Sequence, residues 1–491
     1  MTASANAALD IGLAGPDVEP SAAGVGLPES IEAEIAHVNR WRRRNAYYYA
    51  QLHRLFRLHI PPGASVLEIG CGLGDLLNDL QPARGVGIEA KPHEARLAAR
   101  RFDHLEIVCA DYDRFELGET FDYVIVSNAL AQMKDVQAMF ERIRAVCRPD
   151  TRIIVAYFNA LWEPVLKLAA LLRQRANVPE ANWLSVTDVL NLLGLADLEV
   201  VRTSSEILFP KYVPGLSTFL NRCLCRFWPF NKLPLVNLFV ARPRMAPTRG
   251  RSLTCSVIVP THNERGNIAG AIERTPHLGS HTEIIFVDGN STDGTADEVE
   301  RQMRSNPERD IKLLHQGDGR GKGDAVRKAF AAATGDVLMI LDADLTVPPE
   351  DLPKFFNAIA DGRGEFINGT RLVYPLEHQA MRFLNKCGNQ VFSMLFSWLL
   401  NQRFRDTLCG TKVLLRTNYE RIAAARSYFG EFDPFGDFDL IFGAAKANLK
   451  IVEIPVRYAA RRYGETSINR FRDGWLLLAM SWVAFRKLKL R

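Results

Sequence analysis

The sequence predicts an α/β protein of two domains, each built on a mainly parallel sheet. Short, mainly apolar runs at 66–69, 284–287 and 337–341 end in a glycine turn or an acidic residue, and a segment of helical periodicity follows each one. This alternation occurs in both halves of the 491-residue chain. Between the halves, residues 244–253 contain arginine, proline and glycine without apolar periodicity, which is typical of a linker.

Composition and charge describe an ordinary globular protein. Hydrophobic residues make up 47% and charged residues 24%, enough to build sizeable cores. The net charge of +5 suits phosphates or an anionic membrane but falls short of a nucleic-acid signature, so no nucleic-acid partner is expected. The eight cysteines include no CxxC pair, which indicates a reduced, cytoplasmic setting. Residues 1–27 predict a flexible tail rather than a signal peptide, and no apolar run is long enough to span a membrane.

The first domain is expected over residues 28–243. Helical periodicity over 31–58 combines basic residues at 42–44 with tyrosines at 47–49. The favoured interpretation is an amphipathic helix that packs on the domain, and an RNA-binding arm is the alternative.

A glycine-rich loop follows the first expected strand of this domain. The glycines at 70, 72 and 74 let the backbone turn tightly and approach a ligand closely. The next strand ends at Glu89, an acid placed to bind both hydroxyls of a ribose. A third strand ends just before Asp111, whose carboxylate could accept a hydrogen bond from an adenine amino group.

These motifs resemble those of class I S-adenosylmethionine-dependent methyltransferases over about residues 31–243. The resemblance implies a Rossmann-like sheet of seven strands and S-adenosylmethionine as the cofactor. It assigns the cofactor contacts to Glu68, Gly70, Gly72, Gly74, Glu89 and Asp111. Many such enzymes have a histidine after the fourth strand, but residues 128–132 contain none. An active methyltransferase and a non-catalytic cofactor-binding module both stay open.

The second domain, expected over residues 254–465, is organised around the stretch 335–352. Its apolar run predicts a buried strand, and Asp342 and Asp344 follow this strand. In extended backbone, side chains two residues apart point the same way, so both carboxylates would reach one crevice. Such oxygen ligands suit Mg²⁺ or Mn²⁺, with a substrate diphosphate completing the shell. A solvated turn is the alternative for these two residues taken alone.

Three neighbouring motifs favour the metal site over the solvated turn. One expected strand stops at Pro260, with Glu264 on the following loop. The next strand ends at Asp288, which can bind a nucleobase amide or a ribose hydroxyl. A glycine-rich turn containing Lys322 enters a helix with free N–H groups, as a diphosphate contact requires.

The order of these motifs resembles family 2 inverting glycosyltransferases of the GT-A fold, above all the dolichyl-phosphate mannose and polyprenyl-phosphate glucose synthases. The resemblance implies a nucleotide-sugar donor held by Pro260, Glu264, Asp288, Lys322 and Asp342, a metal on Asp342 and Asp344, catalytic roles for Asp344, Arg405 and Asp406, and phosphate contacts from Arg371 and Arg461. Thr346 and Lys412 depart from the family pattern, in which glutamine and arginine are common.

The acceptor stays open at this point. A lipid phosphate is already an oxyanion and needs no general base, whereas a sugar hydroxyl would need a carboxylate. Asp406, Asp437 and Asp439 are candidates for such a base.

The last segment, residues 466–491, predicts an amphipathic helix with a basic end. Tryptophan, phenylalanine and leucine are frequent at 475–485, and residues 486–491 are strongly basic. Such a helix is typical of an interfacial membrane anchor, and packing on the domain or in a homo-oligomer is the alternative.

The resulting hypothesis is a bifunctional enzyme of cell-envelope glycan or glycolipid assembly at the inner face of the cytoplasmic membrane. One half would transfer a sugar to a polyprenyl phosphate or glycolipid with inversion, and the other would methylate in the same pathway. The alternative is a glycosyltransferase acting on a glycan hydroxyl, with a non-catalytic S-adenosylmethionine-binding module.

Overall fold

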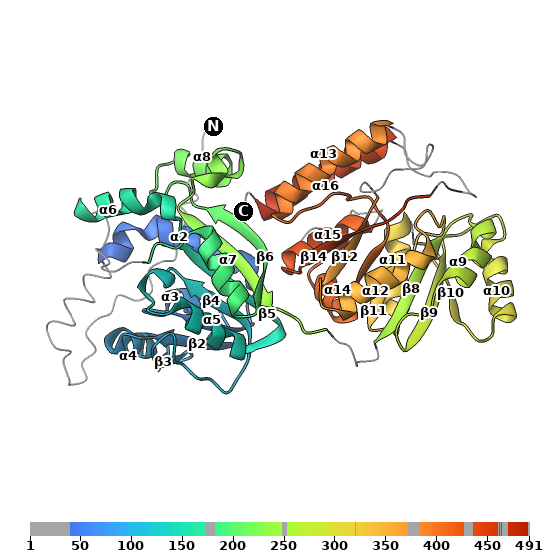
Figure 1. Ribbon diagram of the computed structural model, residues 1–491. Coiled ribbons are helices and arrows are strands. Elements are labelled where there is room, and N and C mark those ends of the chain that lie inside the picture. Colours follow the sequence, from blue (N-terminus) through green and yellow to red (C-terminus); the bar gives the residue numbers. More distant parts are fainter. Residues whose placement is uncertain are drawn as a thin grey trace, which may run out of the picture. The chain divides into compact units, whose positions relative to one another are not determined.

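The computed structural model describes residues 40–172, 182–247, 253–319, 321–371, 383–426, 436–459, 461, 463 and 470–489. The chain divides into two compact units, Met1–Arg244 and Met245–Arg491 (Figure 1). Each unit contains its own seven-stranded sheet with helices on both faces, which confirms the expected fold class. The expected tail and part of the linker lie outside the described residues.

The first sheet has the strand order β3-β2-β1-β4-β5-β7-β6. Its strands are β1 (Ser65–Ile69), β2 (Arg84–Glu89), β3 (Glu106–Cys109), β4 (Phe121–Ser127), β5 (Cys147–Phe158), β6 (Leu198–Glu206) and β7 (Val236–Pro243). Strands β1 to β5 are parallel, and β7 runs antiparallel between β5 and β6. The order reverses between β1 and β4, and ligands of open α/β sheets bind outside the carboxyl ends of strands at such a point.

Helices cover both faces of this sheet. They are α2 (Ala46–His59), α3 (Asp75–Asp79), α4 (Pro92–Arg101), α5 (Val136–Ala145), α6 (Glu163–Leu171), α7 (Val186–Leu195) and α8 (Leu216–Arg222), with the 3-10 turns η1 (Leu130–Gln132), η2 (Ala160–Trp162), η3 (Leu224–Arg226) and η4 (Phe230–Lys232). Neighbouring β1 residues point to opposite faces, so Val66 packs with α2 and α3 while Leu67 packs with α5 and α7.

The first helical segment is amphipathic, as expected, but it is not one continuous helix. Residues 40–44 are helical, a turn follows at Asn45, and α2 then begins at Ala46. Leu52 and Phe56 of α2 are buried against the sheet, at 2% and 0% exposure. Residues 31–39 lie outside the described part.

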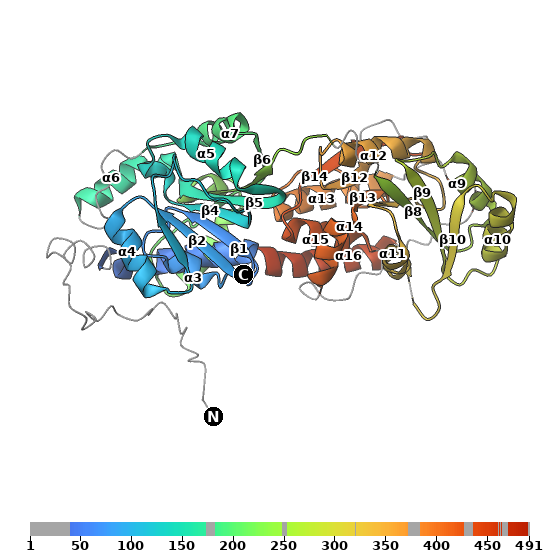
Figure 2. The same cartoon turned by 90° about the horizontal axis from the view of Figure 1, so that it is seen from below.

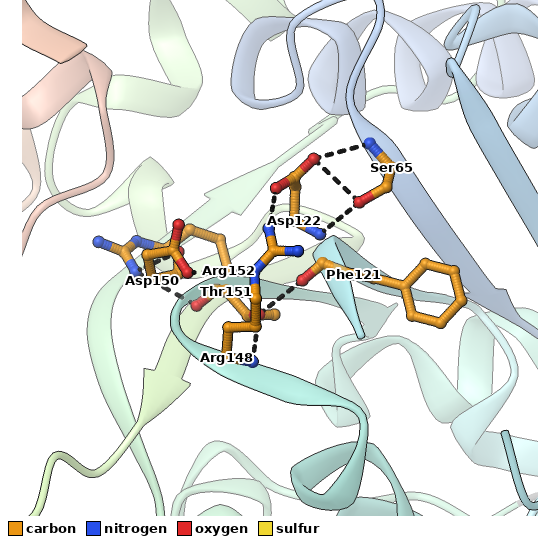
Figure 3. Close-up of polar contacts among 7 residues, drawn as sticks. All are labelled: Ser65, Phe121, Asp122, Arg148, Asp150, Thr151 and Arg152. Carbon is orange, nitrogen blue, oxygen red and sulfur yellow. Dashed lines mark hydrogen bonds and ion pairs between the residues drawn. The ribbon is translucent and has the colours of Figure 1, made fainter. Parts of the chain in front are cut away.

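A polar network joins the amino ends of the three central strands (Figure 3). Asp122 of β4 accepts hydrogen bonds from Ser65 of β1, from N at 2.8 Å and from Oγ at 2.9 Å, and also pairs with Arg148 of β5. Thr151 Oγ1 donates to the Phe121 carbonyl oxygen at 2.6 Å. Because these contacts lie at the opposite edge from the glycine-rich loop, they fix the strand register without occupying the ligand edge.

The second sheet has the strand order β10-β9-β8-β11-β13-β12-β14. Its strands are β8 (Thr254–Thr261), β9 (His281–Asp288), β10 (Asp310–His315), β11 (Val337–Ile340), β12 (Phe366–Thr370), β13 (Lys412–Leu415) and β14 (Ile451–Pro455). Strands β8 to β11 are parallel, and β13 is antiparallel to both β11 and β12. The parallel half therefore brings the carboxyl ends of β9, β8 and β11 together at one edge.

Two apolar cores flank this sheet. One includes α9 (Ile268–Arg274), α10 (Thr295–Ser305) and α12 (Leu352–Ala360), which follows η6 (Pro349–Asp351). The other includes α11 (Gly321–Ala332), α13 (Phe383–Leu400), α14 (Arg416–Ala424), α15 (Asp437–Lys446) and α16 (Arg470–Leu488). Helices α13 and α16 pack side by side (Figure 1 and Figure 2). None of the helices in the described parts of the chain has the length and apolarity that crossing a bilayer requires.

Candidate functional sites

The glycine-rich loop lies at the carboxyl end of β1. Gly70, Gly72 and Gly74 have φ angles of 76°, 54° and 80°, which place them in the left-handed region that other residues rarely adopt. A Cβ on Gly70 would also stand 2.6 Å from the Cβ of Ala129. The loop therefore requires glycine for its backbone conformation and, at Gly70, for space.

Glu89, at the end of β2, is positioned by the same loop. Its Oε2 accepts a hydrogen bond from Gly72 N at 2.8 Å, and its Oε1 accepts from Lys91 N and Tyr112 Oη, both at 3.0 Å. A carboxylate offers about four acceptor positions, so one remains for a ribose hydroxyl. Tyr112 is a residue that the sequence analysis missed, because nothing in the local pattern shows that it reaches Glu89.

Glu68 of β1 is 2% exposed, and its Oε2 has no hydrogen-bond partner. Burial raises the pKa of this carboxyl to about 8, although the nearby Arg42 guanidinium acts in the opposite direction. A buried carboxyl oxygen that lacks a partner suits a ligand ammonium group, such as the one on the methionine part of S-adenosylmethionine. This observation fits the cofactor expected here.

Asp111 lies after β3 with an exposed side chain. The neighbouring Ala110 N donates to the Glu89 carbonyl oxygen at 3.3 Å, so Asp111 lies beside the ribose-binding candidate. Its position is compatible with an adenine contact.

Arg42 is a second residue that the sequence analysis missed at this site. It forms an ion pair with Asp75 at the start of α3, which also accepts from Arg101 Nη2 at 2.7 Å. A Cβ on Gly72 would lie 3.7 Å from Arg42 Nη2. This arrangement indicates that Arg42 supports the glycine-rich loop.

A hollow lies beside the carboxyl ends of β4 and β5. It is lined by Asn128, Leu130, Ala131, Tyr157, Phe158, Asn182, Trp183 and Leu184. Asn128 has a φ of 56°, and its Nδ2 donates to Tyr48 Oη at 2.8 Å while its buried Oδ1 has no partner. These lining residues include no carboxylate and no histidine, so they offer a methyl acceptor polar contacts but no obvious base.

In the second unit, the expected nucleotide-binding residues meet at the carboxyl edge of β8 and β9. Pro260 and Thr261 of β8 lie opposite Val287 and Asp288 of β9. Asp288 is 5% exposed; its Oδ2 accepts from Ser291 N at 3.2 Å and its buried Oδ1 has no partner. A hydrogen-bond donor on a nucleobase or a ribose would give Asp288 Oδ1 the partner that it lacks.

Glu264 lies on the loop after β8, within electrostatic reach of the Asp-x-Asp turn. Its Oε2 accepts from Asn267 Nδ2 at 2.6 Å. Burial raises the pKa of Glu264, and the Asp344 carboxylate adds to this shift. The candidate nucleotide contacts and the candidate metal ligands therefore share one site.

Asp342 and Asp344 do not lie in extended backbone. β11 ends at Ile340, Asp344 is in a turn, and Leu345 follows with a φ of 52°. The expectation that extended backbone aligns the two side chains is therefore wrong.

Each of the two carboxylates is paired with a cation. Lys322 Nζ contacts Asp342 Oδ1 at 2.6 Å, and Arg461 Nη2 contacts Asp344 Oδ2 at 2.6 Å. Although burial opposes ionisation, Lys322 and other nearby cations hold the pKa of Asp342 below its usual range. Thr346 donates from N at 3.1 Å and from Oγ1 at 2.8 Å to Asp344 Oδ1, and so orients it.

The donor set fits a divalent metal that is shared with a substrate. Within the described residues, no three side chains of the histidine, cysteine or acidic types are grouped to hold a metal ion. Mg²⁺ commonly takes one or two carboxylates and completes its shell with substrate phosphates and water. Gly410 leaves room for this arrangement, because a Cβ there would lie 2.0 Å from Asp342 Oδ2.

Arg371 and Asp406 form an internal pair. Arg371 Nε and Nη2 donate to the two Asp406 oxygens at 2.7 and 2.9 Å, and Asn389 Nδ2 donates at 2.8 Å. Asp406 is 0% exposed and also accepts from the backbone N of Arg371 and Leu408, both at 3.0 Å. In this structure Arg371 and Asp406 are bound to each other, and the catalytic role of Asp406 and the phosphate role of Arg371 stay predictions.

Arg405 and Asp439 have contrasting environments. The Arg405 side chain is exposed, while its backbone N donates to Glu453 at 2.9 Å. Asp439 Oδ2 lies 3.7 Å from Arg327 and 3.8 Å from Arg426. The Asp437 side chain lies outside the described residues.

Comparison with known proteins matches each unit to a family. Residues 256–415 match the model described as "Glycosyl transferase family 2", and residues 40–203 match the one described as "Methyltransferase domain". A solved SAM-dependent methyltransferase of Thermotoga maritima, a possible histamine N-methyltransferase, is 13% identical with a TM-score of 0.35, covering 43% of this chain and 97% of that one.

Three similar curated proteins align with the second half of the chain. Glycosyltransferase AglJ of Haloferax volcanii is 28% identical, over 45% of this chain and 68% of its own length. A dolichol-phosphate mannosyltransferase of Pyrococcus furiosus is 29% identical, over 44% and 59%. An undecaprenyl-phosphate 4-deoxy-4-formamido-L-arabinose transferase of Pectobacterium carotovorum is 28% identical, over 44% and 62%. The chain thus spans about three fifths of the last two relatives. Residues 40–203 form a methyltransferase domain and residues 256–415 a family 2 glycosyltransferase domain, joined in one chain.

Proposed function

We propose that the second unit transfers a sugar, with inversion, from a nucleotide sugar to a polyprenyl phosphate in a metal-dependent reaction. The unpartnered Asp288 oxygen at the carboxyl edge of β9, beside the Asp342 and Asp344 turn, carries this proposal. A hydrogen-bond donor of the nucleoside would satisfy the Asp288 oxygen. A diphosphate with its metal would bind at the Asp342 and Asp344 turn.

The state of two of the three candidate bases favours a phosphate acceptor over a hydroxyl acceptor. Asp406 is saturated with hydrogen bonds, and Asp439 lies between two arginines. A phosphate oxyanion attacks without a base, so the chain has only to position it in line with the anomeric carbon. The names of two relatives specify dolichol phosphate and undecaprenyl phosphate.

The acidic and the basic residues of this site have different proposed roles. Asp288 and Glu264 hold the nucleoside, and Lys322 meets the donor diphosphate. The exposed Arg405, and Arg461 beside Asp344, attract and orient the acceptor phosphate. Asp342 and Asp344 would hold the metal, which would supply positive charge beside the departing nucleoside diphosphate.

A transfer assay with GDP-, UDP- and dTDP-sugars and a polyprenyl phosphate tests this proposal. Wild-type protein should give a lipid-extractable radioactive product, and Asp342→Asn should lower kcat by about 100-fold or more because the leaving group loses its support. Asp361→Asn is the control, since Asp361 follows α12 and pairs with Arg363. A labelled product only on a water-soluble glycan would instead show a hydroxyl acceptor.

For the first unit, we propose S-adenosylmethionine binding and methyl transfer in the same envelope-glycan pathway. The unpartnered oxygen of Glu68 and the remaining acceptor position of Glu89 support cofactor binding. The hollow beside Asn128 has a volume of only about 10 Å³, room for one small group, and its lining favours an acceptor group that reacts without a base. Cofactor binding without any methylated lipid or glycan would favour the non-catalytic module.

We also propose that α16 makes peripheral contact with the inner face of the cytoplasmic membrane. Trp475 and Trp482 are 75% and 57% exposed, while Met480 and Ala484 pack into the core. Arg486 and Lys487 lie in the last turn. This combination is that of an interfacial helix, and a contact between copies is the alternative.

A further inference from the structure

We propose that the methyltransferase unit has a membrane-docking surface of its own, which binds an anionic lipid bilayer. The surface consists of the exposed apolar side chains of residues 212–233, here called the cap surface. Its members are Tyr212, Val213, Leu216, Phe219, Phe227, Trp228, Phe230 and Leu233. Trp228 is 81% exposed and Phe219 55%. A cluster of exposed aromatic and aliphatic side chains within one short segment marks an interaction surface.

The cap surface is held in place by buried polar residues beneath it. Asn221 is 6% exposed; its Oδ1 accepts from Phe209 N at 2.7 Å and its Nδ2 donates to Phe209 O at 2.8 Å. Ser217, at 0% exposure, donates to Lys211 O at 2.7 Å and accepts from Val213 N at 2.6 Å. Because the side chains of Asn221 and Ser217 fix the backbone of this segment, its exposed apolar side chains belong to an ordered structure.

Helix α6 extends this surface. Trp162 Nε1 donates to Leu233 O at 2.6 Å, and Asn159 Nδ2 donates to Pro234 O at 3.1 Å. These bonds join the residues just before α6 to the end of the segment that carries the cap surface. Val165, Leu168 and Leu171 recur at helical spacing and are 50%, 55% and 79% exposed.

Charge identifies an anionic bilayer as the occupant. Residues 207–263 contain no aspartate and no glutamate. The cap segment contributes Arg222 and the exposed Lys232, while Arg226 pairs with the buried Glu206 at 2.7 Å. Interfacial segments combine exposed aromatic side chains with basic residues, which contact the headgroups of anionic lipids. In a symmetric dimer the same patch would face itself, so these cations would oppose one another.

Binding of the full chain to lipid vesicles tests the proposal. Phe219→Ser with Trp228→Ser should lower binding to phosphatidylglycerol-containing vesicles about tenfold, because two interfacial aromatic side chains are lost. Leu195→Ser is the matched control, since Leu195 lies on α7 and is 64% exposed. Thermal stabilisation by S-adenosylmethionine should persist in the double variant and show that the unit is folded.

A second pair of substitutions separates the cap surface from α16. Trp475→Ser with Trp482→Ser should weaken vesicle binding independently, and the four changes together should weaken it further. Unchanged binding after the Phe219 and Trp228 substitutions would overturn the proposal. So would a concentration-dependent dimer that these substitutions dissolve, because the surface would then be a contact between copies. Sugar transfer to a soluble short-chain acceptor should stay unchanged, which separates this inference from the proposed activity.

Discussion

The Glu68 carboxyl makes the stability of the first unit depend on pH. Its pKa is raised by burial from 4.5 to about 8, so the folded state holds a proton that the unfolded chain releases. Stability is therefore lost as the pH rises between these two values. Glu68→Gln removes this cost and should raise the melting temperature at pH 9 by about 3 °C or more.

The gain should nearly disappear at pH 4, where the carboxyl is mostly protonated in both states. Thermal scans at the two pH values measure this difference. Glu116→Gln, which changes a carboxylate that is 81% exposed, serves as the control and should show no such gain. The Glu68 variant should also respond less to S-adenosylmethionine, because the amide, unlike the carboxyl, cannot ionise beside the ligand ammonium. An equal effect at both pH values would show that burial does not shift this carboxyl.

Gly410 offers a test of the sugar-transfer site that leaves its charged groups unchanged. A Cβ at this position would stand 2.0 Å from Asp342 Oδ2, so Gly410→Ala must displace that carboxylate. We expect sugar transfer to fall by about tenfold to 100-fold, since a small displacement of a ligand-positioning group is costly. Gly388→Ala is the control, because no atom lies within 4 Å of its added Cβ in α13. Full activity in the Gly410 variant would remove Asp342 from the site.

At the scale of secondary-structure elements, Glu283 joins three parts of the second sheet. Glu283 of β9 is 0% exposed and accepts from Ser256 of β8 and from Thr334 N before β11, and it pairs with Lys312 of β10. These partners outweigh the effect of burial and lower its pKa to about 2. The charged carboxylate is therefore part of the folded sheet.

Glu283→Gln should destabilise the second unit by about 3 kcal/mol at pH 7, because the neutral amide loses the interactions that lower the pKa of Glu283 from 4.5 to about 2. A group with a lowered pKa stabilises the fold above its unfolded pKa and loses that effect as the pH falls. The difference from wild type should thus shrink as the pH drops from 4.5 toward 2. Denaturant unfolding measures this difference, with Glu300→Gln as the control, since the Glu300 side chain on α10 is 55% exposed. A constant difference across this range would show that the charge is not responsible.

Some of the secondary-structure elements could be predicted from the sequence, and others could not. Runs such as 337–341 located the buried strands, because a fully covered parallel strand is apolar throughout. The break at Asn45 and the turn that holds Asp344 were missed, since both depend on local backbone angles that periodicity does not reveal. The candidate nucleotide residues lie at strand ends of one sheet, and the candidate cofactor residues lie at strand ends of the other. The topology of each sheet was therefore enough to predict that the residues of each set lie close together.

The sequence could not predict contacts between segments that are distant along the chain. The bond from Tyr112 to Glu89 and the ion pair between Arg42 and Asp75 require the folded arrangement of several elements. Arg371 pairs with Asp406, which lies 35 residues away in the sequence, so each side chain is bound by the other. A motif identifies such residues but does not show which of them satisfy one another.

At the scale of the whole molecule, the chain has two compact units, and each contains one of the two proposed ligand sites. We expect S-adenosylmethionine to stabilise one thermal transition and a nucleoside diphosphate with Mn²⁺ to stabilise another. A ligand at about 100 times its Kd adds roughly 2.7 kcal/mol to the form that binds it. Glu89→Ala should abolish only the first shift and Asp288→Ala only the second, because each removes a carboxylate from one site.

The same scans distinguish two independent enzymes from a sensor that regulates a transferase. If the units are independent, saturating S-adenosylmethionine leaves both the nucleotide shift and the rate of sugar transfer unchanged. If the first unit is a sensor, the cofactor changes the nucleotide affinity, and by thermodynamic reciprocity the nucleotide changes the cofactor affinity by the same factor. Glu89→Ala should then abolish the coupling while basal sugar transfer persists. A nucleotide shift without any cofactor shift in wild-type protein would contradict both models and leave the first unit without its proposed ligand.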